Sequence, residues 1–186
     1  MTYRTHLVGG AVAAMFLTIA ASNRVLGLEP CTTPMFWGIM TSSLAGSLAP
    51  DIDQQTSKIG KTLKPISAVV CKCFGHRTFC HSIWFLLLIY GTIKTVSPSM
   101  SLYALAFCFG GLSHLMLDCF NVRGVQLLWP LPFTVRLGKV KLATLHGSFM
   151  DNLQEWLFRL SLECMFVALF LIAEFRCAAP FGGMFL

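Results

Sequence analysis

Two histidines five residues apart, His76 and His81, are the part of this sequence best suited to chemistry. Arg77 lies between them, and a run of almost pure hydrocarbon begins directly after them, at Ile83. Polar side chains are costly at the mouth of a membrane helix and usually serve a function there. Imidazoles bind divalent transition metals, and a guanidinium group clamps phosphate. The stretch 75–82 therefore indicates a metal or anion site.

Carboxylates occur in ligand-type spacing at two other places. His114 and Asp118 are four residues apart, so both reach a single ion from one face of a helix. Asp51 and Asp53 follow Pro50, which ends a helix, so the two carboxylates turn toward a shared ion or one of them bridges two. Histidine together with carboxylate is the ligand chemistry of Zn²⁺, Mn²⁺ or Fe²⁺.

Together these side chains are enough for a centre of one or two divalent ions, Zn²⁺ or Mn²⁺. The expected metal ligands are His6, Asp51, Asp53, His76, His81, His114 and Asp118. A two-ion centre activates water and stabilises both oxygens of a displacement at phosphorus. Arg77 is expected to bind the phosphate. Glu155 is expected to take a ligand or base role, although its spacing to Arg159 fits an ion-pair ladder as well.

Each motif also has a simpler structural interpretation. His6 fits an interfacial side chain, and Asp51 with Asp53 fits the cap of a turn. His114 and Asp118 fit a hydrogen-bonded pair inside a bundle. The shared position of all these motifs at the ends of apolar runs favours one common site instead.

The composition indicates what kind of scaffold positions these groups. The 186 residues are 55% hydrophobic and only 12% charged, against about 25% charged residues in soluble domains. The length fits one domain covering residues 1–186. The net charge of +6 comes from basic residues in short loops between apolar runs, not from a basic soluble module. A membrane protein that does not bind nucleic acid is therefore expected.

Five apolar runs predict an all-α, polytopic membrane helix bundle with four to five transmembrane helices. A spanning helix needs about 17 to 25 residues, and several runs are shorter, so tilted or partly interfacial helices are expected. The first run also resembles a secretory signal, although its removal would discard His6. The runs are Leu7–Ala21, Met35–Ala49, Ser82–Val96, Ser101–Phe120 and Leu157–Phe175.

The basic residues predict how the runs are oriented. With the N-terminus in the cytoplasm, eleven of the fourteen Lys and Arg residues lie on the cytoplasmic side. The same topology brings all five histidines, and five of the eight acidic residues, to the cytoplasmic leaflet. The metal site is therefore predicted at the cytoplasmic interface. The connection at 121–156, rich in Trp and Pro at 129–132, is expected to form an interfacial turn or re-entrant cover.

In these motifs the chain resembles the YdjM-type family of predicted inner-membrane, metal-dependent hydrolases. The resemblance spans roughly residues 5 to 155, and the order and spacing of the motifs carry it. Cys80 stands where the family pattern commonly has a small or hydroxyl residue. The motifs are Thr5-His6, Leu48–Asp53, His76–Ser82, Gly111–His114 with Asp118, and Gly124–Pro130.

The resemblance implies an enzyme of the bacterial inner membrane, a metal-dependent hydrolase. Combined with the residues, it predicts cleavage of a phosphoester in a lipid-like or otherwise amphiphilic substrate by a metal-activated water. The use of His and Asp on helices is also similar in style to zinc-dependent phospholipase C enzymes. The alternatives are a non-enzymatic metal or proton transporter, which usually has polar groups near the midplane, and a structural membrane protein.

Overall fold

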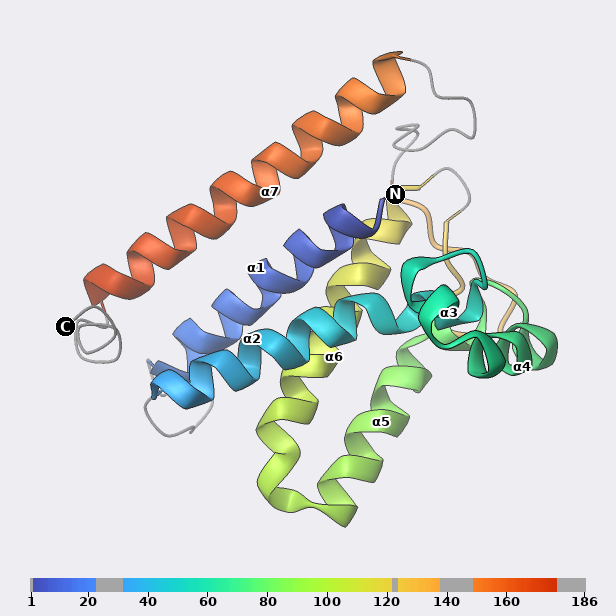
Figure 1. Ribbon diagram of the computed structural model, residues 1–186, viewed down its shortest axis with the longest axis horizontal. Coiled ribbons are helices and arrows are strands. Elements are labelled where there is room, and N and C mark those ends of the chain that lie inside the picture. The colour runs from blue at the N-terminus through green and yellow to red at the C-terminus, as the bar shows by residue number, and fades with distance from the viewer. Residues whose placement is uncertain (1, 23–31, 122–123, 138–148, 177–186) are drawn as a thin grey trace.

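The computed structural model describes residues 2–22, 32–121, 124–137 and 149–176 (Figure 1). Within these residues every regular element is a helix, and a single antiparallel bridge joins Val125 to Val135. The all-α prediction is thus confirmed. The α-helices are α1 (Tyr3–Ser22), α2 (Thr33–Leu48), α3 (Lys58–Thr62), α4 (Lys64–Phe74), α5 (Ile83–Val96), α6 (Ser101–Cys119) and α7 (Phe149–Arg176). The 3₁₀ turns are η1 (Ala49–Asp53), η2 (Phe79–His81) and η3 (Pro98–Met100).

The helices α1, α2 and α6 form the centre of the bundle. α5 packs on α6, and the long α7 lies along α1 (Figure 1). Met15, Leu17, Ile39 and Ala106 are fully or almost fully buried where the three central helices meet. This apolar core fixes the relative positions of the helix ends, and the polar motifs occupy those ends.

Small residues allow α2 and α6 to approach at backbone distance. A Cβ atom added to Gly46 would lie 1.9 Å from the Phe107 carbonyl oxygen, and one added to Gly110 would lie 1.9 Å from the Ser43 carbonyl oxygen. The Ser43 hydroxyl donates a hydrogen bond to the Gly10 carbonyl of α1, at 2.8 Å. Close approach of small residues is how helices associate in lipid, where the hydrophobic effect does not drive them together.

Each of the five predicted apolar runs lies on a helix of its own, α1, α2, α5, α6 or α7. Among the described residues, two helical segments are long and apolar enough to cross a membrane, Tyr3–Ala21 and Pro98–Cys119. Ile83–Val96 is apolar but shorter. The structure therefore supports two spans by length and composition, fewer than the predicted four to five.

The stretch between α2 and α5 was not predicted to be helical. It folds into η1, α3, α4 and η2, which pack at the end of the bundle where α2 ends and α5 begins (Figure 1). The loop at 124–137 reaches the same end, since the Ile83 amide donates to the Leu127 carbonyl at 2.9 Å. His146, in the predicted connection, lies outside the described residues.

Candidate metal centre

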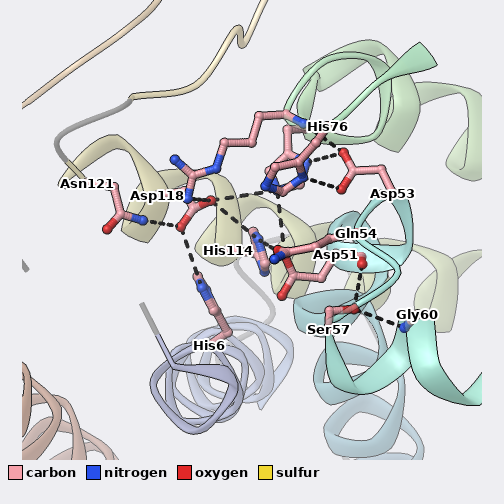
Figure 2. A network of polar contacts seen from close by, with 12 residues as sticks. His6, Asp51, Asp53, Gln54, Ser57, Gly60, His76, His114, Asp118 and Asn121 are labelled. Carbon is pink, nitrogen blue, oxygen red and sulfur yellow. Dashed lines mark hydrogen bonds and ion pairs between the residues drawn. The ribbon is translucent and has the colours of Figure 1, made fainter. Parts of the chain in front are cut away.

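The turn η1 carries the first two carboxylates out of α2. Pro50 lies in the first turn of η1, where its missing amide donor is harmless. The Ser57 hydroxyl donates to the Asp51 carbonyl at 2.7 Å and accepts the Gly60 amide at 2.9 Å. Figure 2 shows these two hydrogen bonds of Ser57 beside Asp51, whose side chain points toward His114. The local fold thus aims the Asp51 carboxylate back at the bundle.

Four ligand-type atoms converge at this end of the bundle. His81 Nε2 lies 3.6 Å from Asp118 Oδ2 and 3.9 Å from Asp51 Oδ1. His114 Nε2 lies 3.8 Å from the same two oxygens. The atoms come from η1, η2 and α6, so the fold brings together residues up to 67 positions apart.

Both imidazoles have a fixed orientation. His114 Nδ1 lies 2.7 Å from the Ser47 carbonyl oxygen, which can only accept, so Nδ1 carries the proton. His81 Nδ1 lies 2.9 Å from Asp53 Oδ2, which fixes the same tautomer when the carboxylate is ionised. In both rings the Nε2 atom is buried and has no hydrogen-bond partner among the described residues. Each Nε2 therefore presents a lone pair to the two carboxylate oxygens.

The separations test whether these atoms fit an ion. Four ligands at about 2.1 Å from a tetrahedral zinc ion lie about 3.4 Å from one another. The four separations between an imidazole nitrogen and a carboxylate oxygen, 3.6–3.9 Å, are slightly wider than this and too long for hydrogen bonds. Unpartnered, buried imidazole nitrogens facing carboxylates at such distances fit a divalent cation. We name His81, His114, Asp51 and Asp118 the four-ligand cluster.

Asp118 has a second oxygen that faces the opposite way. Its Oδ1 lies 3.6 Å from His6 Nε2 and accepts a hydrogen bond from Asn121 Nδ2 at 2.7 Å. The His6 ring stacks on that of His114 with centroids 3.8 Å apart, and Figure 2 shows His6 reaching Asp118 from α1. An aspartate with ligand-type nitrogens on both sides is suited to bridging two ions.

Asp53 has a different geometry from the four-ligand cluster. It is fully buried, and its oxygens accept from His76 Nδ1 at 2.8 Å, His81 Nδ1 at 2.9 Å and the Arg77 amide at 2.9 Å. Burial acts to raise the pKa of Asp53, but the hydrogen bonds from both histidines and the Arg77 amide outweigh it and hold that pKa well below its ordinary value. The carboxylate is thus ionised and engaged in direct hydrogen bonds.

Replacing Asp53 with asparagine is expected to weaken the binding of Zn²⁺ or Mn²⁺ by about 10- to 100-fold. The amide has only one acceptor oxygen, so it cannot orient both His76 and His81. The measurement is metal competition against a chromogenic chelator. Thr56→Ala removes an exposed hydroxyl nearby and is the matched control, expected to bind metal like the unchanged protein. An unaltered affinity in the Asp53→Asn variant would contradict the orienting role.

Arg77 lies at the open side of the cluster. Its Nη2 is 3.3 Å from Asp118 Oδ2, while its Nε and Nη1 are buried without hydrogen-bond partners. Its φ of 64° is in the left-handed region, which costs about 1–2 kcal/mol for a residue with a side chain. The side chains of Asp51, His76 and Arg77 are 20%, 31% and 20% exposed, whereas those of His81 and His114 are fully buried. Access to the cluster is therefore from the side of Arg77 and His76.

Glu155 also lies at this end of the bundle, but its hydrogen bonds are to α1 and the residue before it. The Glu155 carboxylate accepts from the Thr2 amide at 2.6 Å and the Thr5 hydroxyl at 3.0 Å, so it joins α7 to the start of α1. Both of these contacts are with the start of α1 and not with the four-ligand cluster.

Burial, together with the charge of Asp53, raises the pKa of Cys80 to about 12. Cys80 is thus a neutral thiol beside the site.

All seven predicted metal ligands lie in one connected network with Arg77. His6 joins this network through Asp118. Asn121 and the Ser47 carbonyl also belong to the network but were not predicted from the motifs. Asn121 follows Asp118 at i+3, a spacing that could have indicated it. No sequence signal identifies the Ser47 carbonyl, because the backbone carbonyl is common to all residues.

Comparison with known proteins adds an independent observation. The model of a family described as YdjM inner membrane protein matches residues 1–179. An uncharacterized protein, YvsG of Bacillus subtilis (strain 168), is 35% identical over 153 residues, covering 82% of this chain and 86% of its own. The inner membrane protein YdjM of Escherichia coli (strain K12) is 33% identical over 141 residues, covering 74% of this chain and 69% of its own. No solved structure matches the chain.

Proposed function

This chain belongs to the YdjM family of inner membrane proteins, and we propose that it is a membrane-embedded, metal-dependent hydrolase. Its substrate in this proposal is a phosphoester in a lipid or another amphiphile. The four-ligand cluster holds a divalent ion, Zn²⁺ or Mn²⁺, and His6 with Asp118 offers a place for a second.

One observation carries the proposal. Two buried imidazole nitrogens with fixed lone pairs face two carboxylate oxygens at 3.6–3.9 Å, without hydrogen bonds between them. Leaving such polar atoms unpaired in a bundle interior is costly. A cation bound between them would give both nitrogens a partner.

The residues around the cluster divide the remaining tasks. A divalent ion in such a site supplies a Lewis acid and lowers the pKa of bound water toward neutrality. Asp53 orients His81 and His76, which is the role of an outer carboxylate behind a metal-binding histidine. Arg77 has two unpaired, buried donor nitrogens, Nε and Nη1, for the oxygens of a phosphate. His76 is exposed enough at the open side to exchange a proton with a substrate.

The proposed topology has four to five transmembrane helices, with the N-terminus and the site on the cytoplasmic side. Two observations support it. The ends of α1, α2 and α6 that carry His6, Asp51 and Asp118 lie together (Figure 2). In addition, α5 is an apolar helix that packs on the candidate span in α6, although it is shorter.

Metal removal tests the proposal. The purified protein is expected to contain about one to two equivalents of Zn²⁺ or Mn²⁺ by elemental analysis. It should cleave a chromogenic phosphodiester, lose this activity on dialysis against a chelator, and regain it when the metal is returned.

A second arm separates hydrolysis from transport and from a purely structural role. Vesicles containing the protein are assayed for uptake of the same metal. Bound metal with uptake but no cleavage of soluble or lipid phosphodiesters would contradict the hydrolase and favour the transporter. Absence of bound metal at micromolar supply would contradict both.

A further inference from the structure

The helix α4 presents an apolar stripe to the outside of the protein. Ile66 and Val69 are 50% and 62% exposed, and Cys73, one turn further along the same face, is also exposed. These residues follow the i, i+3, i+7 spacing of one helix face. The opposite side of α4 is anchored, since Ser67 is fully buried there. The stripe is thus an outward feature of a fixed helix.

Lysines lie on the other, polar side of α4 and just before it. Lys61 precedes α4, Lys64 begins it and Lys72 lies near its end, and all three are exposed. From Gln54 to Leu117 the sequence contains no acidic residue at all. An amphipathic helix with lysines beside an exposed apolar face is the type that lies in the headgroup region of a bilayer. We name Lys61, Lys64, Ile66, Val69 and Lys72 the basic apolar face.

The loop at 124–137, which contacts the end of α4, also carries aromatic and exposed apolar side chains. Phe74, at the end of α4, makes an edge contact with Trp129 at a centroid distance of 6.1 Å. Leu131 and Phe133, a few residues further on, are exposed. Tryptophan is enriched at membrane interfaces, where its ring is partly apolar and its N–H remains hydrated.

A second exposed apolar surface shows the contrast. On α5, Trp84, Leu87 and Leu88 are exposed, and the nearest lysine along the helix is Lys94, in its last turn. That surface suits the hydrocarbon core. The basic apolar face combines two exposed apolar side chains with three lysines on or next to the polar side of the same segment, which suits the boundary between acyl chains and anionic headgroups.

We propose that the basic apolar face docks on the anionic lipid headgroups of the leaflet next to the metal centre. α4 continues through Gly75 directly into His76 and Arg77, which form the open side of the four-ligand cluster. Docking of α4 therefore sets the depth of that opening at the headgroups. This proposal rests on the membrane family and the exposed face, and does not require hydrolase activity.

Site-directed spin labelling of the full chain in lipid vesicles tests the docking. A nitroxide is placed at Val69→Cys, on the face, and at the neighbouring exposed position Ala68→Cys as the matched control, in a background without other reactive cysteines. Collisions with oxygen report lipid, and collisions with a water-soluble nickel chelate report solvent. Vesicles contain phosphatidylcholine alone or phosphatidylcholine mixed with phosphatidylglycerol.

In the anionic vesicles the label at position 69 is expected to favour oxygen and the label at 68 to favour nickel. Changing Lys61, Lys64 and Lys72 to glutamine should lower the ratio of docked to undocked helix about fivefold per lysine, and about 100-fold together, in the anionic vesicles only. Lys94→Gln, in the last turn of α5, is the control and should change nothing.

Three results would overturn the proposal. The first is equal nickel access at positions 68 and 69 in anionic vesicles. The second is docking that is insensitive both to lipid charge and to the three lysine changes. The third is exclusion of both reagents from position 69 with a doubled particle mass, which would place a second copy of the chain on this face instead.

Discussion

The His114→Ala variant is expected to lose its bound metal and at least about 1,000-fold of its hydrolytic rate. Removal of an outer partner of a metal ligand costs about 10- to 100-fold, and His114 supplies an inner atom, so the loss should be larger. His114 is fully buried, and the hydrogen bond from its Nδ1 to the Ser47 carbonyl aims its Nε2 at the cluster, so its removal leaves only three of the four cluster atoms in place. Elemental analysis and phosphodiester cleavage measure the two losses.

His76→Ala is the matched control for this variant. His76 lies in the same network, but its Nδ1 is hydrogen-bonded to Asp53 and its side chain is 31% exposed. The His76→Ala protein should keep its metal while losing part of its rate. Melting curves and gel filtration of both proteins check that each variant is folded. Stoichiometric metal in a folded His114→Ala protein would remove the basis for the four-ligand cluster.

Gly110→Ala is expected to destabilise the bundle by about 3 kcal/mol. The new methyl group would lie 1.9 Å from the Ser43 carbonyl oxygen, so α2 and α6 must separate. A rotamer change cannot relieve this contact, because the backbone of α6 fixes the position of the new Cβ and its partner is a backbone oxygen of α2. The same separation would pull the Ser47 carbonyl away from His114, so metal affinity should fall with stability. Steric-trap unfolding in one fixed detergent measures the change in free energy.

Gly91→Ala makes the same chemical change where there is room for it. Nothing lies within 4 Å of a Cβ added to Gly91, which is inside α5. Alanine is favoured over glycine inside a helix by about 0.5–1 kcal/mol, so this variant should be slightly more stable. If the two variants had the same free energy of unfolding, the close backbone contact between α2 and α6 would not contribute to the stability of the bundle.

Much of the helical architecture was predictable because hydrophobicity dictates it. All five apolar runs became helices, with α5 differing from its run by one residue at the start. The helix α7 begins at Phe149, eight residues before its predicted run, because polar residues alternate with apolar ones in its first two turns and break the continuous apolar run. The segment of α4 is apolar but too short to cross a membrane, and α3 is shorter still, so neither was predicted as a helix of the bundle. They are stabilised by packing on η1, which sequence periodicity does not contain.

The grouping of the polar residues was predictable, but their individual roles were not. His81, His114, Asp51 and Asp118 meet because they end helices on the same side of the bundle. From the sequence alone, Asp51 and Asp53 could not be given different roles, because they are the same residue type only two positions apart. Both lie in the 3₁₀ turn η1, which directs them differently: Asp51 faces the open cluster at 3.8–3.9 Å, and Asp53 is held in hydrogen bonds of 2.8–2.9 Å.

Glu155 shows the limit of reasoning from position alone. It lies near the start of α7, on the predicted side of the membrane, and was grouped with the site. The orientation of α7 about its own axis decides what the carboxylate meets, and the printed sequence does not specify that rotation. In the structure the carboxylate accepts hydrogen bonds from the Thr2 amide, directly before α1, and from the Thr5 hydroxyl, at the helix end whose positive dipole favours an anion.

The four-ligand cluster draws on residues 51, 81, 114 and 118, with His6 beside it. During synthesis the earliest of these leaves the ribosome long before the last, and no two adjacent segments contain a complete ligand set. A nascent chain therefore lacks the complete four-ligand cluster until α6 has been inserted and packed on α2. Because metal affinity arises with the folded arrangement, the proposed ion would be loaded into this cluster only at the end of assembly.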